Sequence, residues 1–206
     1  MKERPILFSG PMVRAILERR KTQTRRIVKP DIANFLEDGW GPEERMYETR
    51  DGDIVPARTL CPYGVPGDRL WVRETFAEVQ PYYGPSDEIP DWVNYKYRAD
   101  FDDFEADPLR FGPNKWRPSI FMPRRASRIL LEITNVRVER LQDITEEDAI
   151  AEGVEPVEWS EDYGGVTCNY TSYIEGFKEI WNETNGPDSW EQNPWVWVIE
   201  FKKIVP

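Results

Sequence analysis

Apolar residues recur at helical spacing in three stretches of the chain. The first predicted helix covers residues 11–20, with Pro11 in its first turn. A short helix is predicted after Thr145, because Thr145-Glu-Glu-Asp resembles a capping box and Gly153 is suited to end the helix. The third helix is predicted over residues 173–184, and its apolar stripe consists of Tyr173, Phe177, Ile180 and Trp181.

Alternation of apolar and polar residues predicts the strands. The strongest signal covers residues 127–141, where the alternation slips by one position and predicts a bulge or a tight turn near Asn135. Residues 22–28, 70–73 and 93–98 are predicted as shorter extended segments. Residues 195–201 are apolar on nearly both faces, which predicts a central or barrel-closing strand.

Short strands separated by loops, with a few short helices, predict an α+β fold built around a small β-barrel or curled sheet. One domain is expected to span residues 1–206, with loop-rich insertions at about 31–62 and 81–113. The sequence has no Gly-rich turn between a strand and a helix, which excludes P-loop and Rossmann folds.

Composition restricts the chemistry. The 206 residues include no His and two Cys, which excludes a catalytic His and nearly excludes a zinc site. We therefore predict neither a metal nor another cofactor. Because the chain has no long apolar run and begins without a signal-like stretch, the sequence predicts a cytoplasmic protein with no membrane contact.

The net charge of −11 is unevenly distributed along the chain. Residues 14–29 contain seven basic residues and one acid, and residues 115–128 contain five basic residues and no acid, so these segments carry +6 and +5 and the rest carries −22. Two concentrated basic segments can hold phosphate on an otherwise acidic protein, which predicts an anion-binding, nucleotide-facing site. Alternatively, both segments are solvated surfaces without a ligand.

Within the first basic segment, Lys21 is a candidate general base. Neighbouring cations lower the pKa of a Lys, and Arg20, Arg25 and Arg26 are close to it in sequence. Thr24 follows three residues later, within reach of Lys21 only if the chain bends there. Alternatively, Lys21 and Thr24 only end a helix and start a strand, and the spacing by itself favours this interpretation.

The second basic segment interleaves aromatic rings with guanidinium groups, so that Trp116 or Phe121 is placed to stack on a base while arginines hold phosphate. Alternatively, the rings belong to the core and the arginines pair with acids. Cys61 is predicted to be a small buried or loop residue rather than a nucleophile. The residues that we expect to contact nucleic acid are Arg20, Arg25, Arg26, Lys115, Trp116, Arg117, Arg124, Arg125 and Arg128.

The segment Leu17-Glu-Arg-Arg-Lys-Thr-Gln-Thr-Arg-Arg resembles the signature of ASCH domains, a branch of the PUA-like superfamily. In that signature a Gly-x-Lys and an Arg five residues after the Lys mark the ligand cleft. Lys21 and Arg26 match it, whereas Arg19 occupies the Gly position.

Further segments are similar to a phage and prophage subfamily that is often labelled a morphogenetic protein. They are Cys61-Pro-Tyr-Gly, Pro66-Gly-Asp-Arg-Leu-Trp-Val-Arg-Glu, Lys115-Trp-Arg-Pro-Ser-Ile, Met122-Pro-Arg and the closing Trp195-Val-Trp-Val-Ile-Glu-Phe. Arg125 stands where members of the subfamily commonly carry an aromatic residue. The resemblance covers nearly the whole chain and implies a PUA-like (ASCH) small β-barrel with short flanking helices, encoded by a phage or prophage.

One branch of this family comprises small amidohydrolases that remove the acetyl group from N4-acetylcytidine. Their site uses a Lys as base, a Thr three residues later as nucleophile and a Glu in a later helix as acid, and Lys21, Thr24 and Glu152 fall on these positions. The resemblance thus implies a metal-independent amidohydrolase acting on a modified nucleoside. The two insertions are absent from the small amidohydrolases.

Two other functions stay open on the sequence. One is a non-catalytic module that binds single-stranded or structured RNA or modified DNA. The other is a phage assembly or host-interaction protein that uses its acidic surface. The oligomeric state is not predicted.

Overall fold

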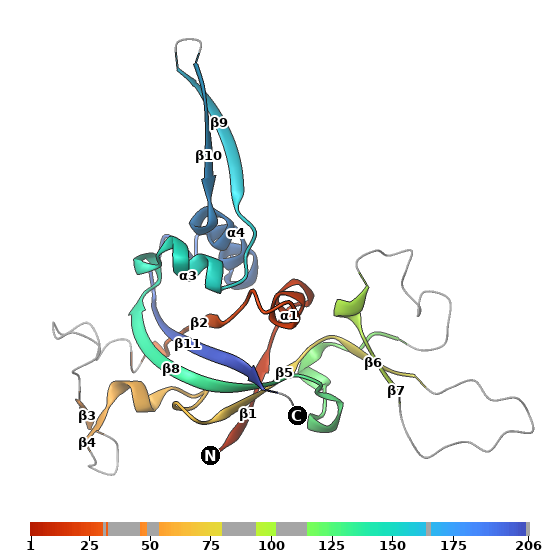
Figure 1. Cartoon of the computed structure of the whole chain (residues 1–206). Helices are drawn as coiled ribbons and strands as arrows, with labels where there is room; N and C mark the ends of the chain where they lie inside the picture. Colours follow the sequence, from red (N-terminus) through yellow and green to blue (C-terminus); the bar gives the residue numbers. More distant parts are fainter. Residues whose placement is uncertain are drawn as a thin grey trace, which may run out of the picture.

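The computed structural model describes residues 1–30, 32, 46–48, 54–79, 94–101, 115–163 and 166–204 (Figure 1). These residues form a mixed α+β fold around one five-stranded sheet of order β1-β5-β8-β11-β2. Its strands are β1 (Glu3–Leu7), β5 (Arg69–Arg73), β8 (Leu130–Arg140), β11 (Trp195–Ile204) and β2 (Gln23–Ile27). β1 and β5 are parallel, and the other neighbouring strands are antiparallel.

All three predicted helices are present: α1 (Gly10–Leu17), α3 (Glu146–Ala151) and α4 (Tyr173–Asn185). The capping box before α3 is confirmed in part, because the Thr145 hydroxyl accepts a hydrogen bond from the Asp148 backbone N–H at 3.1 Å. Gly153 follows the helix with a φ of +75°, a left-handed conformation that glycine adopts without strain. The 3₁₀ turns are η1 (Ala57–Leu60), η2 (Arg98–Asp100), η3 (Ser119–Phe121), η4 (Arg124–Ala126) and η5 (Leu141–Asp143).

β11 is apolar on both faces because each face packs against a different layer. Trp197 and Ile199 belong to a core cluster that includes Val13 of α1. Val198, on the opposite face, packs in a second cluster with Phe177 of α4. The prediction of a central strand is therefore confirmed, since β11 pairs with β8 on one side and with β2 on the other.

The predicted bulge is also confirmed. Glu200 of β11 lies opposite Asn135, but the next residue, Phe201, lies opposite Ile133. Thr134 is therefore the extra residue of β8, one position from where the slip in the alternation predicts the bulge.

Three two-stranded sheets complete the described structure. They are β3 (Met46–Glu48) with β4 (Ile54–Pro56), β6 (Phe76–Val79) with β7 (Asn94–Tyr97), and β9 (Val157–Tyr163) with β10 (Val166–Ser172). The β9–β10 hairpin projects away from the body beyond α4 (Figure 1).

The two expected insertions fall largely outside the described residues, which include only short parts of 31–62 and 81–113. Among the described residues, no pairing joins β1 to β2, so these strands form the two edges of the sheet. The small β-barrel therefore stays a prediction. No helix in these parts of the chain is both long and apolar enough to cross a membrane.

Arg19, which occupies the Gly position of the ASCH signature, has a φ of +64° at the exit from α1. The left-handed region costs a residue with a side chain about 1–2 kcal/mol, partly offset by the larger chain entropy that Gly loses on folding. Arg19→Gly is therefore expected to raise the free energy of unfolding by about 0.5–1 kcal/mol in urea titrations. Glu18→Gly is the control, because Glu18 has a φ of −79°. It should lower the stability, and a loss in both variants would contradict the strain at Arg19.

Candidate functional site

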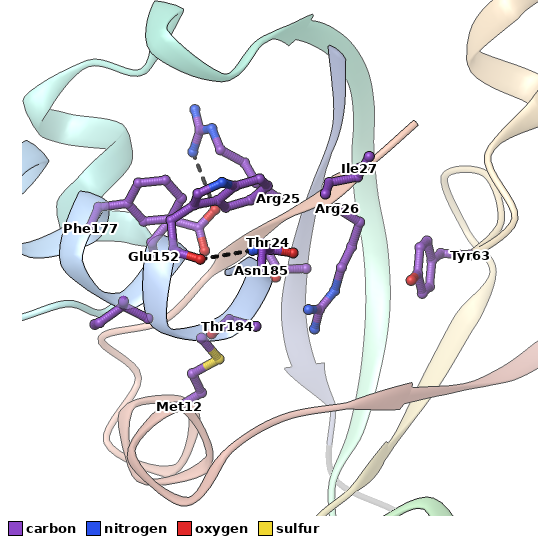
Figure 2. Close-up of a pocket in the computed structure, with 12 residues that line it drawn as sticks. Met12, Thr24, Arg25, Arg26, Ile27, Tyr63, Glu152, Phe177, Thr184 and Asn185 are labelled. Carbon is purple, nitrogen blue, oxygen red and sulfur yellow. Dashed lines mark hydrogen bonds and ion pairs between the residues drawn. The ribbon is translucent and has the colours of Figure 1, made fainter. Parts of the chain in front are cut away.

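A pocket of about 280 Å³ lies at the β2 edge of the sheet (Figure 2). Because β2 is an edge strand, side chains from both of its faces reach the pocket: Thr24 and Arg26 from one face, Arg25 from the other. Glu152, the residue that ends α3, lies on the wall next to α4. The remaining wall is formed by Met12, Ile27, Tyr63, Phe177, Ile180, Trp181, Thr184 and Asn185.

Lys21 lies behind this wall and contacts Glu152 directly. Its Nζ donates to the Glu152 Oε2 at 2.6 Å and to the Glu152 backbone carbonyl at 2.8 Å. The Lys21 side chain is fully buried and that of Glu152 is 2% exposed. Burial lowers the pKa of Lys21 below its ordinary value, and the Arg26 and Arg25 charges lower it further, against the opposite pull of Glu152.

A neighbouring ion-pair network fixes the other carboxylate oxygen of Glu152. The Arg25 side chain, also fully buried, donates to Glu152 Oε1 at 3.2 Å, to Asp148 at 2.9 Å and to Glu139 at 2.5 Å. Arg137 binds the same Asp148 at 2.8 Å and the same Glu139 at 3.0 Å. Glu152 is thus held between two buried cations, which sets both the position and the orientation of its carboxyl group.

Arg26 differs from Arg25, because among the described residues it forms no ion pair with a carboxylate. Its Nη2 donates to the Leu7 carbonyl at 2.7 Å, and its guanidinium lies 5.3 Å from the centroid of the Phe8 ring. Burial lowers the pKa of Arg26 below its usual range. Figure 2 shows the side chain extending into the pocket between Tyr63 and Thr24.

Three buried N–H groups of the pocket residues have no hydrogen-bond partner among the residues that the structure describes: the Nε of Arg25, the Nε of Arg26 and the Nε1 of Trp181. An unsatisfied buried donor costs about 1–3 kcal/mol. A ligand with carbonyl or anionic oxygen atoms would provide acceptors for donors that face the cavity.

The structure brings five of the sequence-predicted site residues together: Lys21, Thr24, Arg25, Arg26 and Glu152. The Lys21 ammonium lies 5.6 Å from the centroid of the same Phe8 ring that Arg26 covers, so the two cations share one aromatic neighbour. No hydrogen bond between Lys21 and Thr24 is found among the described residues. Glu152 links the two instead, since it contacts Lys21 and lines the pocket with Thr24.

Arg20 lies outside the pocket. It forms ion pairs with Glu18 at 2.7 Å and Glu155 at 3.2 Å, and it donates to the Gly153 carbonyl at 3.1 Å. Its nearest acids are both exposed, so this cluster is a surface feature that contributes little to stability.

The second basic segment, residues 115–128, contributes no residue to the pocket. Arg128 binds the buried Glu74 through two bonds of 2.9 Å and also pairs with Asp100 at 2.7 Å. The other cations are nearer the surface: Arg124 pairs with Glu3, Arg117 and Arg125 approach Glu78, and Lys115 is exposed. Trp116 packs against Phe101, with ring centroids 6.2 Å apart. This geometry matches one half of the alternative, in which the arginines pair with acids, but Phe121 is 67% exposed and is not a core residue.

Several pocket residues have no role in the sequence-based hypothesis. Phe177 and Trp181 are predicted as the apolar stripe of α4, and that stripe does pack on the core, but both also form the pocket wall. Tyr63 lies in the Cys61-Pro-Tyr-Gly motif, which is the one sequence signal that points to it. Cys61 itself is buried, and burial raises the pKa of its thiol to about 11, so it is a poor nucleophile at neutral pH.

Comparison of the chain with protein-family models, with curated proteins and with solved structures finds no match. The described residues contain no group of three or more Cys, Asp or Glu side chains placed to hold a metal ion. The pocket geometry and the sequence resemblance are therefore the basis of a functional proposal.

The network around Arg25 gives the protein a pH dependence that can be measured. Burial raises the pKa of Asp148, but the charges of Arg25 and Arg137 and the hydrogen bonds that Asp148 accepts from Gln23 and Arg137 outweigh it, so the pKa lies below its ordinary value. A carboxyl group whose pKa is lower in the folded protein than in the unfolded chain stabilises the fold at a pH above its pKa in the unfolded chain. This stabilisation is lost as the pH falls through the pKa of the group in the folded protein. Between about pH 5 and pH 2 the wild type should therefore lose on the order of 1 kcal/mol more stability than Asp148→Asn. Glu155→Gln is the exposed control, and parallel curves for all three proteins would contradict the network.

Proposed function

We propose that the chain is an ASCH-type, metal-independent amidohydrolase that removes an acyl group from a modified cytidine such as N4-acetylcytidine. The observation that carries this proposal is the 2.6 Å contact between Lys21 and Glu152 behind a pocket that Thr24 also lines. The roles of the three residues come from the resemblance, in which they are base, acid and nucleophile.

A PUA-like curled sheet is part of the same proposal. It is supported by the hydrogen bond from Arg26 of β2 to the Leu7 carbonyl of β1, because this contact links the two edge strands of the sheet. α1 connects these two edges and packs on the core between them. The Arg26 side chain thereby links β2 to β1, two strands that no backbone hydrogen bonds join among the described residues.

The shape and lining of the pocket support a small planar ligand. A volume of about 280 Å³ is near the lower end of small-molecule sites. Phe177, Trp181 and Tyr63 supply aromatic surface for a base, and the Nε of Arg26 supplies a donor for a carbonyl oxygen. A free nucleoside or a single flipped nucleotide fits these features better than a continuous strand does.

In the proposed reaction, the Thr24 hydroxyl oxygen attacks the acyl carbonyl carbon while Lys21 accepts the hydroxyl proton. The bond from this carbon to the exocyclic N4 then breaks, and Glu152 gives its proton to the departing amine of cytosine. Water hydrolyses the acyl ester on Thr24 in a second step, which releases the carboxylic acid and restores the Thr24 hydroxyl. No oxidant, metal or other cofactor takes part in this balance.

This sequence of steps needs Lys21 as a free amine and Glu152 as a carboxylic acid. A direct Nζ–Oε2 contact allows the proton of the ion pair to move from Lys21 to Glu152 without leaving the site. Burial lowers the pKa of Lys21 and so favours its free amine, since it removes water from the ammonium charge. The cations Arg25 and Arg26 further disfavour a charged Lys21.

Acyl release can be tested with purified, chelator-treated protein and N4-acetylcytidine, with cytidine separated and measured by chromatography. Lys21→Ala should abolish the reaction, whereas the surface variant Lys178→Ala should leave it unchanged. An absence of turnover on every acylated cytidine tried would refute the enzyme proposal.

A second candidate is a pocket that binds a nucleoside or a flipped base of RNA or modified DNA without chemistry. The observation that favours it is that Lys21 donates to Glu152 and not to Thr24 among the described residues. In that case N4-acetylcytidine should bind in calorimetry and remain intact, and Arg26→Ala should weaken its binding. Hydrolysis of the bound nucleoside would exclude this candidate.

A further inference from the structure

The β9–β10 hairpin, here called the arm, is a two-stranded sheet that extends beyond α4 into solvent (Figure 1). Trp159 and Tyr170 lie directly opposite each other on its two strands, with their rings stacked 5.4 Å apart at 17°. They remain 39% and 38% exposed. Because isolated hairpins are only marginally stable in water, an exposed aromatic pair on such an arm indicates a surface that a partner covers.

The charge of the arm restricts the kind of partner. Within residues 157–172 the acids are Glu158, Glu161 and Asp162, and there is no Lys or Arg. Such a surface repels nucleic acid and anionic lipid, and it favours a protein surface with exposed apolar groups among cations.

The same chain carries a surface of that kind in its second basic segment. Ile120 and Phe121 of η3 are 59% and 67% exposed. Apart from Met1, no other large apolar side chain among the described residues is as exposed. The side chains of Arg117, Arg124 and Arg125 beside them are 54%, 44% and 73% exposed. These five residues are called the basic patch.

The arm and the basic patch belong to different ends of the molecule. In Figure 1 the arm extends from the α4 side, whereas η3 and η4 lie in the green segment beside β5 and β6. One chain therefore does not bring its own arm onto its own patch, whereas the arm of one copy can reach the patch of a second copy.

We propose that the arm of one copy binds the basic patch of a second copy, so that Trp159 and Tyr170 pack on Ile120 and Phe121. The acids of the arm then face the arginines of the patch, two of which, Arg117 and Arg125, have the partly exposed Glu78 as their acidic neighbour among the described residues. Arm and patch are different surfaces, so two copies can exchange them in a two-fold dimer with two such contacts, or more copies can join head-to-tail in a larger ring or an open chain. This inference is independent of the proposed reaction, because neither surface contributes to the pocket.

Sedimentation velocity over a range of protein concentrations tests the contact. The wild type should form dimers or larger species, and association should weaken by at least about tenfold between about 0.1 M and 0.5 M salt. Trp159→Ser should abolish association through the arm, and Phe121→Ser should abolish it through the patch. Each variant alone should be monomeric.

Mixing the two variants provides the decisive control, because each retains the surface that the other has lost. The mixture should form one-to-one dimers and no larger species, since the dimer has no intact arm or patch left to extend it. If Trp159→Ser unfolds the hairpin, Glu158→Lys with Asp162→Lys is the second arm variant, and it should give the same dimers with Phe121→Ser. A wild type that stays monomeric at all concentrations, variants that associate like the wild type, or a mixture that stays monomeric would each overturn the proposal.

Discussion

Glu152→Ala is expected to lower the free energy of unfolding by about 3–5 kcal/mol, the usual cost of removing one partner from a buried ion pair. The loss has two sources, because the variant leaves the buried Lys21 ammonium without its carboxylate and removes one of the three carboxylates around Arg25. Denaturant titration at neutral pH measures the effect.

A matched control is available three residues along the chain. Glu155 pairs with Arg20, but its side chain is 79% exposed, so Glu155→Ala should change the stability by less than about 0.5 kcal/mol. Glu152→Gln should cost less than Glu152→Ala, because the amide keeps the volume and an acceptor for Lys21. Equal small losses at positions 152 and 155 would contradict the buried pair.

Thr24→Val is expected to reduce acyl release by at least about a thousandfold while the protein stays folded. Valine keeps the branched shape in the pocket wall, so the change removes the nucleophilic oxygen with little effect on packing. Thr24→Ser keeps a hydroxyl and should retain measurable activity. Initial rates together with the unfolding curve of each variant separate loss of chemistry from loss of structure.

The same nucleophile predicts a covalent intermediate. Acid quenching during turnover, followed by peptide mass spectrometry, should find one acetyl group on the peptide that contains Thr24. The Thr24→Val protein should show none. An active wild type with no acylated peptide, and full activity in Thr24→Val, would assign the attack to water instead.

The sequence predicts the helices and strands in which buried residues recur at a regular spacing. α1, α4 and β8 each have one apolar face, and the bulge near Asn135 appears as a slip in the alternation, so local pattern is sufficient to find them. The β9–β10 hairpin is not predicted, because its acids and hydroxyl residues interrupt the alternation and no layer covers it. β1 is also missed, since Pro5 lies within a five-residue edge strand.

The site could be predicted only in part from the sequence. Lys21 and Glu152 are 131 positions apart, and only the family resemblance connects them before the structure does. The charge of a segment likewise does not show whether acids far away in the sequence pair with its basic residues in the fold. Arg25 contacts Glu139 and Asp148, and Arg128 contacts Glu74, so much of the positive charge that marks the two basic segments is neutralised in the fold. Arg26 remains as the pocket cation without a carboxylate among the described residues.

We propose that the pocket formed by Thr24, Glu152 and the adjacent Lys21 releases an acyl group from a modified cytidine. A time course of acetate and cytidine production from excess N4-acetylcytidine, with chelator present, tests it most directly. The wild type should complete many turnovers per protein molecule, and Thr24→Val should complete none. A folded wild-type protein that binds N4-acetylcytidine and releases no acetate would contradict it.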